Sequence, residues 1–374
     1  MRIVAVAGTR PNFIKIASLM REFRRREAIQ SVLVHTGQHY DRQMSEAFFD
    51  DLEIPRPDVE LGIGSGSHAV QTGQILIKME EVLLREKPDV LVVVGDVNST
   101  IAAAMAASKV QIPVAHVEAG LRSHDRSMPE EINRLLTDAI SDHLFTTEES
   151  GNANLRREGV PEEKIHFVGN VMIDTLVLHR WKAARSEILA KLGLQAGPKD
   201  NPRRYGVLTL HRPSNVDDPQ VLAGILGAVG KISARLPVVF PCHPRTQKFL
   251  KASPPAGVPL NGNGQAGIRL LEPLGYLEFL RLTSEAAVVL TDSGGIQEET
   301  TVLGVPCLTL RNNTERPVTL TQGTNRLVGP DPAKILAGYD AIENGPAPGA
   351  RVPPLWDGKA AGRIADILER IYRG

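Results

Sequence analysis

The sequence is poor in cysteine and aromatic residues and has no excess of charge of either sign. Cys242 and Cys307 are the two cysteines in 374 residues. Their wide separation argues against a disulfide framework and against a zinc site built on closely spaced cysteines. The 43 basic and 43 acidic residues cancel to a formal net charge of zero. Because nucleic-acid binding depends mainly on excess lysine and arginine, we expect no nucleic-acid partner.

Long hydrophobic runs are also missing. No stretch approaches the ~20 apolar residues that a membrane-spanning helix needs, and the start, "MRIVAVAGTRP", lacks the cleavage pattern of a signal peptide. We therefore expect a soluble, cytoplasmic protein that does not bind a membrane.

Short apolar runs rich in valine and isoleucine alternate with longer amphipathic segments through both halves of the chain. This alternation predicts an α/β fold of two doubly wound, Rossmann-like domains with parallel sheets facing a cleft. The length also favours two domains, and we place them at 1–175 and 176–355. The predicted strands are "RIVAVAG", "SVLVHTG", "VLVVVGD", "VAHVEAG", "HLFTT" and "IHFVGN", then "YGVLTL", "LPVVFP", "IRLLEP", "AVVLTD", "PCLTL" and "NRLVG".

The stretch "LTDSGGIQEE" predicts a strand that ends at a turn of Ser293, Gly294 and Gly295 and continues as a helix. Glycine lets a backbone approach a ligand closely, and the free N–H groups of a helix N-terminus attract anions. A diphosphate would fit there, although a tight turn that merely needs glycine explains the pattern equally well. Glu298 or Glu299, one turn further, could accept hydrogen bonds from ribose hydroxyls, which suggests a nucleoside diphosphate.

The first domain begins with a similar turn, "GTRPNFIK", in which Gly8 ends a strand and Arg10 and Lys15 add positive charge. The G-x-G-x-x-G spacing of dinucleotide sites is missing, so the sequence does not indicate a nicotinamide cofactor. Lys15 could alternatively be a solvated helix residue.

Three carboxylates follow strands or begin loops in the first half: Asp96, Glu118 and Glu130. Burying a carboxylate is costly unless it is paired or used, so these residues are candidates for acid–base catalysis. The alternative is that they form ion pairs with nearby arginines such as Arg134 and close loops. For Glu131 we favour that structural interpretation.

The second half places His211 after one predicted strand, in "LTLHRPSN", and His243 after the next, in "FPCHPR". Two such histidines suggest proton transfer or phosphate contact. No third ligand accompanies them at metal-site spacing, so we expect no metal. Arg316, in "NTERPVT", could bind an anion or pair with Glu298 or Glu299.

Taken in order, "GTRPNFIK", "TGQHYD", "GDVNST", "HVEAGLRS", "MPEEINR", "HRPSN", "TDSGGIQEE" and "TERP" resemble the non-hydrolysing UDP-N-acetylglucosamine 2-epimerase family over nearly the whole chain. The resemblance implies a GT-B-like fold whose last helix, 356–374, returns to the first domain. It also implies epimerisation of UDP-N-acetylglucosamine to UDP-N-acetylmannosamine, by elimination of UDP to a 2-acetamidoglucal and re-addition, without a cofactor and in a homodimer.

The resemblance also assigns roles to the candidate residues. The catalytic candidates would be Asp96, Glu118, Glu130 and His211. The UDP-sugar would be bound by Ser293, Gly294, Gly295 and Arg316 at the diphosphate, Glu299 at the ribose, and Arg10, Lys15 and His243 along the UDP side.

Departures from the family pattern leave other functions open. Many members continue Arg-Arg-Glu-Asn where this chain reads "RPSN" after His211, and Gln74 stands where an arginine is expected, so allosteric activation by the substrate is not implied. The alternatives are an epimerase of a UDP-2,3-diacetamido uronic acid, a hydrolysing relative that releases free sugar, a GT-B glycosyltransferase, and a nucleotide-sugar sensor without turnover.

Overall fold

The chain forms two compact units in the computed structural model. Met1–Leu178 with Pro354–Gly374 make unit 1, and His179–Pro353 make unit 2. The structure describes residues 1–37, 49–195, 204–242, 246–247, 250, 258, 260, 267–345, 349 and 351–373. No helix in these ranges is both long enough and apolar enough to cross a membrane.

Unit 1 is built on a parallel seven-stranded sheet in the order β3-β2-β1-β4-β5-β6-β7. The Val- and Ile-rich runs form the strands as predicted, and β4 is buried along its whole length because helices cover both faces of the sheet. The two-residue β3 was not predicted, since it is too short to show a periodic pattern. The strands are β1 Arg2–Ala7, β2 Gln30–His35, β3 Val59–Glu60, β4 Val90–Val94, β5 Val114–Ala119, β6 His143–Thr146 and β7 Ile165–Phe167.

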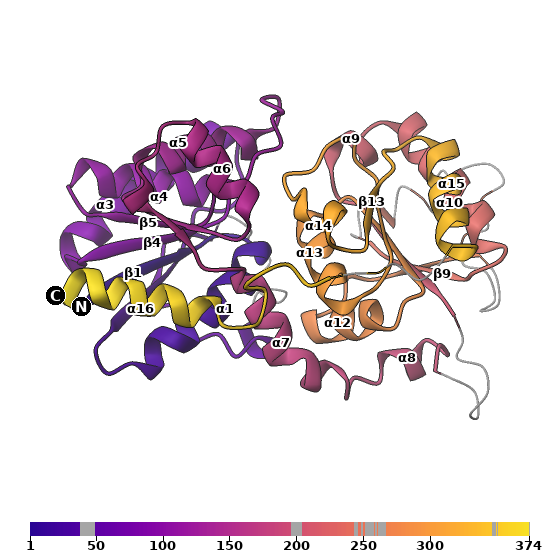
Figure 1. Cartoon of the computed structure of the whole chain (residues 1–374), viewed down its shortest axis with the longest axis horizontal. Helices are drawn as coiled ribbons and strands as arrows, with labels where there is room; N and C mark the ends of the chain where they lie inside the picture. The colour runs from indigo at the N-terminus through magenta and orange to yellow at the C-terminus, as the bar shows by residue number, and fades with distance from the viewer. Residues whose placement is uncertain are drawn as a thin grey trace. The chain divides into compact units, whose positions relative to one another are not determined.

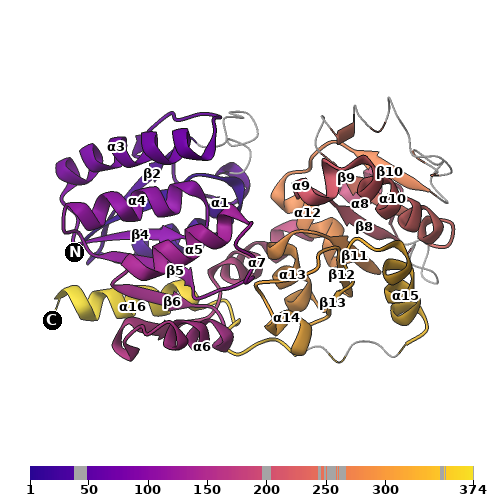
Figure 2. The same cartoon turned by 90° about the horizontal axis from the view of Figure 1, so that it is seen from above.

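Helices cover both faces of this sheet. Figure 1 shows α3 and α4 on one side and α1 and α16 on the other, and Figure 2 shows α3 beside α4. The small side chains of α4 are almost all buried, which lets α4 pack closely between the sheet and α3. The helices are α1 Arg10–Arg25, α3 His68–Glu86, α4 Asn98–Lys109, α5 Pro129–Ile140, α6 Glu149–Arg157, η1 Glu162–Lys164, α7 Val171–Ala183 and α16 Ala360–Arg373.

The last helix, α16, returns to unit 1 as predicted. The indole of Trp356, just before this helix, donates a hydrogen bond to the carbonyl of Thr147 at 2.8 Å. Arg26, which follows α1, pairs with Asp366 at 2.7 Å. Ile364 and Leu368 of α16 are fully buried. Apolar burial therefore holds α16 in place, and polar contacts fix its register.

Unit 2 repeats the architecture with a parallel six-stranded sheet in the order β10-β9-β8-β11-β12-β13. Its two faces carry separate cores, one under α10 and α15 and the other under α8, α12 and α13. The strands are β8 Gly206–Thr209, β9 Val238–Pro241, β10 Ile268–Leu271, β11 Val288–Thr291, β12 Cys307–Thr309 and β13 Asn325–Leu327. The helices are α8 Ile188–Lys191, α9 Pro213–Val216, α10 Pro219–Ser233, α12 Tyr276–Ser284, α13 Gly294–Leu303, α14 Val318–Thr321 and α15 Pro332–Glu343.

Both sheets have one position where the strand order reverses. In unit 1 this point lies between β1 and β4, and in unit 2 it lies between β8 and β11. Loops leave the two strands of such a pair toward opposite faces of the sheet, which opens a crevice at their carboxyl ends where open α/β sheets bind ligands. A ligand site is therefore expected at the residues that follow these four strands.

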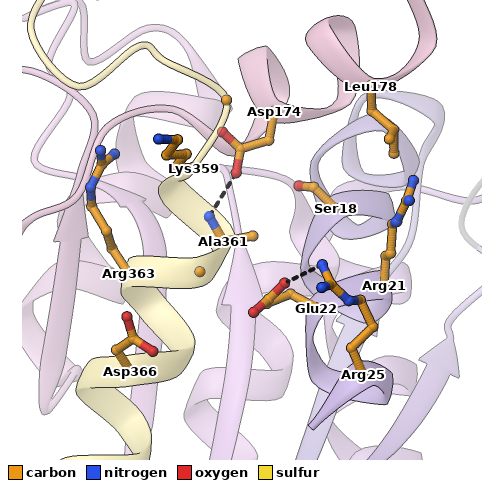
Figure 3. Close-up of a pocket in the computed structure, with 12 residues that line it drawn as sticks. Ser18, Arg21, Glu22, Arg25, Asp174, Leu178, Lys359, Ala361, Arg363 and Asp366 are labelled. Carbon is orange, nitrogen blue, oxygen red and sulfur yellow. Dashed lines mark hydrogen bonds and ion pairs between the residues drawn. The ribbon is translucent and has the colours of Figure 1, made fainter.

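Unit 1 also has a cavity of about 480 Å³ between the second half of α1, α7 and the start of α16. Figure 3 shows Arg21 and Lys359 among its charged side chains. Asp174 of α7 accepts hydrogen bonds from the N–H groups of Ala360 at 3.1 Å and Ala361 at 2.7 Å. These bonds satisfy donors that the first turn of a helix leaves open, so Asp174 fastens α16 to α7.

Replacing Asp174 with alanine should lower the free energy of unfolding by ~1 kcal/mol, because both N–H groups of α16 lose their acceptor. Burial raises the pKa of Asp174 to about 6, against the lowering effect of the two N–H groups. The folded protein thus binds this proton more tightly than the unfolded chain, and the contribution of Asp174 decreases as the pH rises from about 4 to about 6.

Urea unfolding of the unaltered protein and of Asp174→Ala across this pH range measures the difference in their free energies of unfolding. This difference should become smaller as the pH rises, and a difference that becomes larger would contradict the role of Asp174.

Candidate active site

The carboxyl ends of β1 and β4 are joined by one buried side chain, Asn12. Its Oδ1 accepts a hydrogen bond from the N–H of Gly8 at 3.3 Å, and its Nδ2 donates to the carbonyl of Val94 at 3.0 Å. Asn12 is 2% exposed. Because the amide both accepts and donates, a carboxylate at this position could not make both bonds. Asn12 therefore holds the two loops at the switch point of unit 1 together.

Lys15 and Glu118 form a buried ion pair at the same place. Their side chains are 7% and 5% exposed, so Lys15 is not a solvated helix residue. A Cβ added to Gly95 would lie 2.9 Å from Lys15 Nζ and 3.5 Å from Glu118 Oε2. Gly95 thus leaves room for the pair, which lies directly against the turn after β4.

The backbone of Glu118 has an unusual conformation. Its φ of 73° lies in the left-handed region, which costs a residue with a Cβ about 1–3 kcal/mol. The pairing of β5 with β6 shifts register at this residue, between Val117 and Ala119. Such strain is found most often where a side chain is held for function, so the conformation supports Glu118 as a site residue.

Asp96, which follows β4, pairs with Arg134 of α5, and Arg134 also pairs with Glu131 at 2.7 Å. Glu131 accepts hydrogen bonds from the N–H groups of Ser123 at 3.0 Å and His124 at 2.9 Å. Burial would raise the pKa of Glu131, but these N–H groups and Arg134 lower it. Glu131 is thus an ionised carboxylate that closes a loop, as the structural interpretation predicted.

Glu130, the neighbouring catalytic candidate, is half-buried in the first turn of α5. Pro129, directly before it, occupies the first position of the helix, where proline is favoured. Glu130 and Glu131 therefore face different surroundings although they are adjacent in the sequence.

In unit 2 the carboxyl ends of β8 and β11 bring His211 and Asp292 together. Asp292 Oδ1 lies 2.7 Å from His211 Nδ1. Asp292 is fully buried and also accepts hydrogen bonds from the N–H of Arg212 at 3.0 Å and Nδ2 of Asn215 at 3.1 Å. Burial would raise the pKa of Asp292, but His211 and the backbone N–H groups lower it. The carboxylate stays ionised and fixes the ring of His211.

Asp292 was not among the candidates chosen from the sequence, although it belongs to the "TDSGG" motif. The side chain of His211 remains 58% exposed, so its Nε2 edge is accessible while Nδ1 is held. An aspartate that orients a histidine in this way prepares it to exchange protons through the other nitrogen.

The predicted glycine turn starts α13, with Ser293 as N-cap and no side-chain capping bond. A Cβ on Gly294 would lie 2.5 Å from Arg316 Nη1, so this glycine leaves room for Arg316 beside the helix N-terminus. Arg316 is 4% exposed and pairs with Glu298 at 2.8 Å and with Glu315. Of the two predicted uses of Arg316, pairing with Glu298 is confirmed, and the pair holds a guanidinium beside the N-terminus of α13.

Glu299, the residue after Glu298, lies buried against α12. It is 5% exposed and accepts a hydrogen bond from the hydroxyl of Tyr276 at 3.1 Å. Burial raises the pKa of Glu299 to about 7, against the lowering effect of the Tyr276 hydrogen bond. A polar ligand that offered further donors would stabilise its ionised form.

Two of the predicted UDP contacts cannot be placed in the fold. His243 and the side chain of Arg10 lie outside the described residues. Within the part of the chain that the structure covers, no group of three or more histidine, cysteine, aspartate or glutamate side chains is placed to hold a metal ion.

The contrast between Glu130 and Glu131 predicts a stability difference. Glu131→Gln should lower the free energy of unfolding by ~3 kcal/mol, because it leaves the buried charge of Arg134 with one carboxylate fewer. Glu130→Gln, the matched control in the same helical turn, should change it by less than ~1 kcal/mol. Thermal or urea unfolding of the two variants measures this, and equal losses would refute the structural role of Glu131.

Comparison with known proteins identifies the family. The family model of UDP-N-acetylglucosamine 2-epimerase matches residues 21–369. The UDP-N-acetylglucosamine 2-epimerase of Methanocaldococcus jannaschii is 44% identical over 98% of this chain and 99% of its own length. A UDP-2,3-diacetamido-2,3-dideoxy-D-glucuronate 2-epimerase of Pseudomonas aeruginosa is 39% identical over 99% of this chain and 100% of its own length.

Solved structures agree with the sequence comparison. The crystal structure of the M. jannaschii UDP-GlcNAc 2-epimerase in complex with UDP-GlcNAc and UDP superimposes with a TM-score of 0.89 at 43% identity, covering 99% of this chain and 100% of that chain. Both Rossmann-like units are thus of the GT-B-like type found in these enzymes. The chain belongs to the UDP-N-acetylglucosamine 2-epimerase family, whose members are non-hydrolysing isomerases.

Proposed function

We propose that this protein interconverts UDP-N-acetylglucosamine and UDP-N-acetylmannosamine. The proposal rests mainly on the charged groups at the two switch points. Unit 1 has the pair Lys15–Glu118. Unit 2 has the pair His211–Asp292 and a helix N-terminus beside Arg316, which would bind an anion. In a chain of this family, these groups supply what an elimination of UDP requires.

The reaction consists of two opposite steps. A base removes the proton on carbon 2 of the sugar, the electron pair forms a double bond between carbons 1 and 2, and the bond from carbon 1 to the UDP oxygen breaks. UDP leaves with the electrons of that bond. A proton is then added to carbon 2 from the other face while the UDP oxygen attacks carbon 1. The carbon skeleton ends at its original oxidation state, so the cycle needs no redox cofactor.

Unit 2 would hold the UDP. Ser293, Gly294 and Gly295 offer N–H groups at the N-terminus of α13, and the buried Arg316 adds a guanidinium beside them. Glu299 would accept the ribose hydroxyls. This binding must persist while UDP is detached from the sugar, because the same molecule has to be added back.

The protonatable groups would carry out the transfers. Asp96, Glu118, Glu130 and His211 are the catalytic residues of the proposal, and Asp292 holds His211 so that Nε2 exchanges the proton. Lys15 neutralises Glu118 in its buried position, and Arg134 does the same for Asp96. Arg10, Lys15 and His243 remain predicted contacts along the UDP side.

A second candidate substrate is a UDP-2,3-diacetamido uronic acid, because the P. aeruginosa relative with that name is 39% identical. The carboxylate at carbon 6 of such a sugar would need an added cation. Release of free sugar would indicate a hydrolysing variant, and transfer to an acceptor would indicate a glycosyltransferase. The proposal further includes a cytoplasmic homodimer, which sedimentation of the purified protein tests.

Incubation of the purified protein with UDP-N-acetylglucosamine in deuterated water tests the proposal. We expect a mixture of the two UDP-sugars with deuterium at carbon 2, measured by proton NMR without added NAD. A lack of exchange, together with conversion of the diacetamido uronic acid derivative, would transfer the proposal to that substrate. A lack of any conversion would overturn it.

Asp96→Asn, Glu118→Gln and His211→Gln should each reduce kcat by ~100-fold or more, because each removes a group that transfers a proton. Asp217→Asn is the matched control, since this exposed carboxylate lies close to His211 in the sequence but outside the proposed site. Initial rates of epimerisation measure the effect. A variant within a few-fold of the unaltered protein would remove that residue from the catalytic set.

The raised pKa of Glu299 predicts that the affinity for the UDP-sugar depends on pH. With its pKa raised to about 7, Glu299 is largely protonated below that pH and ionised above it. If the ionised form accepts the ribose hydroxyls, affinity for UDP-N-acetylglucosamine should increase as the pH rises through about 7. Calorimetric titration measures it, and Glu299→Gln should bind more weakly and lose this dependence. A variant with the same pH profile would contradict the role of Glu299.

A further inference from the structure

A second buried ionic cluster in unit 1 centres on His116 of β5. Its ring is 0% exposed and is placed between two acceptors. Nδ1 lies 2.6 Å from Asp138 Oδ1, and Nε2 lies 2.8 Å from the carbonyl oxygen of Gly95. None of the groups proposed for catalysis belongs to this cluster, but the Gly95 carbonyl immediately precedes Asp96.

The hydrogen bonds decide how many protons the ring carries. A carbonyl oxygen has no proton to give, so Nε2 of His116 must donate to Gly95. Asp138 acts as an acceptor for two other donors, the N–H of Gly120 at 3.0 Å and Arg122 Nη2 at 2.7 Å. Burial would raise the pKa of Asp138, but His116 and Arg122 lower it. An ionised Asp138 requires that Nδ1 also donates.

The charges of the cluster then balance. His116 and Arg122 are positive, and Asp138 and Glu158 are negative, with Arg122 Nη2 2.6 Å from Glu158 Oε2. Asp138 and Arg122 are 2% and 4% exposed. A buried charge is tolerated only when it is paired and hydrogen-bonded, and each charge here has a partner of the opposite sign.

The cluster links two turns that position the proposed catalytic carboxylates. Gly95 and Gly120 have φ angles of 68° and 79°, in the region that favours glycine. His116 holds the carbonyl before Asp96, and Asp138 holds the N–H two residues after Glu118. A Cβ on Gly120 would lie 2.5 Å from the carbonyl oxygen of Gly151, so this turn is also closely packed.

We propose that His116 is a buried imidazolium and, with Asp138, a positioning residue for Asp96 and Glu118 in the epimerase reaction. This inference rests on the proposed function for its effect on catalysis, but not for the protonation of His116. The two parts have separate tests.

The protonation of His116 is measured by nitrogen-15 NMR of the full-length protein labelled at its histidines. The ring of His116 is identified by slow exchange of its N–H protons with solvent and by its absence from the spectrum of His116→Gln. Both ring nitrogens should have the chemical shifts of protonated nitrogens, because each one faces an acceptor. An unprotonated ring nitrogen would overturn the imidazolium.

Asp138→Asn tests the role in catalysis without removing the hydrogen bonds. The amide oxygen can still accept from Gly120 and Arg122, and the amide NH₂ can donate to Nδ1 of a neutral His116 that keeps its bond to Gly95. The fold has no need to change, but the charge of the ring is lost. We expect kcat to decrease by ~10–100-fold, as for other groups that orient site residues, with KM within about 2-fold.

Asp366→Asn is the control, because this carboxylate of unit 1 is 69% exposed and lies in α16. An Asp138→Asn protein that shows a neutral His116 by NMR and an unchanged kcat would overturn the positioning role. If Asp138→Asn fails to fold, His116→Gln provides the same kinetic comparison. An unaltered protein without epimerase activity would refute the proposed function, while the NMR result would still decide the protonation of His116.

Discussion

The site depends on one constraint, which is that charges buried at the carboxyl ends of parallel strands must be paired. Removing one partner of a buried ion pair costs ~3–5 kcal/mol, so such pairs fix the positions of their members. Each unit meets the constraint near the carboxyl ends of its central strands, where every such pair has at least one buried member. The pairs are Lys15–Glu118, Asp96–Arg134 and His116–Asp138 in unit 1, and His211–Asp292 and Arg316–Glu298 in unit 2.

The different roles proposed for the two units follow from the same arrangement. In unit 2 the N-terminus of α13 and Arg316 favour an anion, while in unit 1 the switch point gathers carboxylates with their counter-ions. An elimination needs both kinds of group, because a leaving diphosphate must be stabilised and a carbon-bound proton must be removed. In the proposed reaction, unit 2 would stabilise the leaving UDP, and groups of both units would transfer protons.

The sequence predicts the strands well, because fully buried parallel strands appear as continuous Val- and Ile-rich runs. It also selects polar residues at strand ends, and the structure places Asp96, Glu118 and His211 at or directly after the carboxyl ends of β4, β5 and β8. It favours a structural role for Glu131, which the ion pair with Arg134 confirms, but the helical pattern alone does not show which of the adjacent residues Glu130 and Glu131 meets Arg134. The left-handed φ of Glu118 and the contact between His211 and Asp292, 81 residues apart in the chain, arise only when the sheets assemble.

The proposed epimerisation requires that the bond between carbon 1 and the UDP oxygen breaks while UDP stays bound. Positional isotope exchange tests it most directly, with oxygen-18 placed in the oxygen that bridges carbon 1 and the β-phosphorus. While UDP is detached, the β-phosphate can rotate and make its oxygens equivalent. We expect the label to move to non-bridging positions as carbon 2 is epimerised, which phosphorus NMR detects. Epimerisation with all of the label still in the bridge would contradict it.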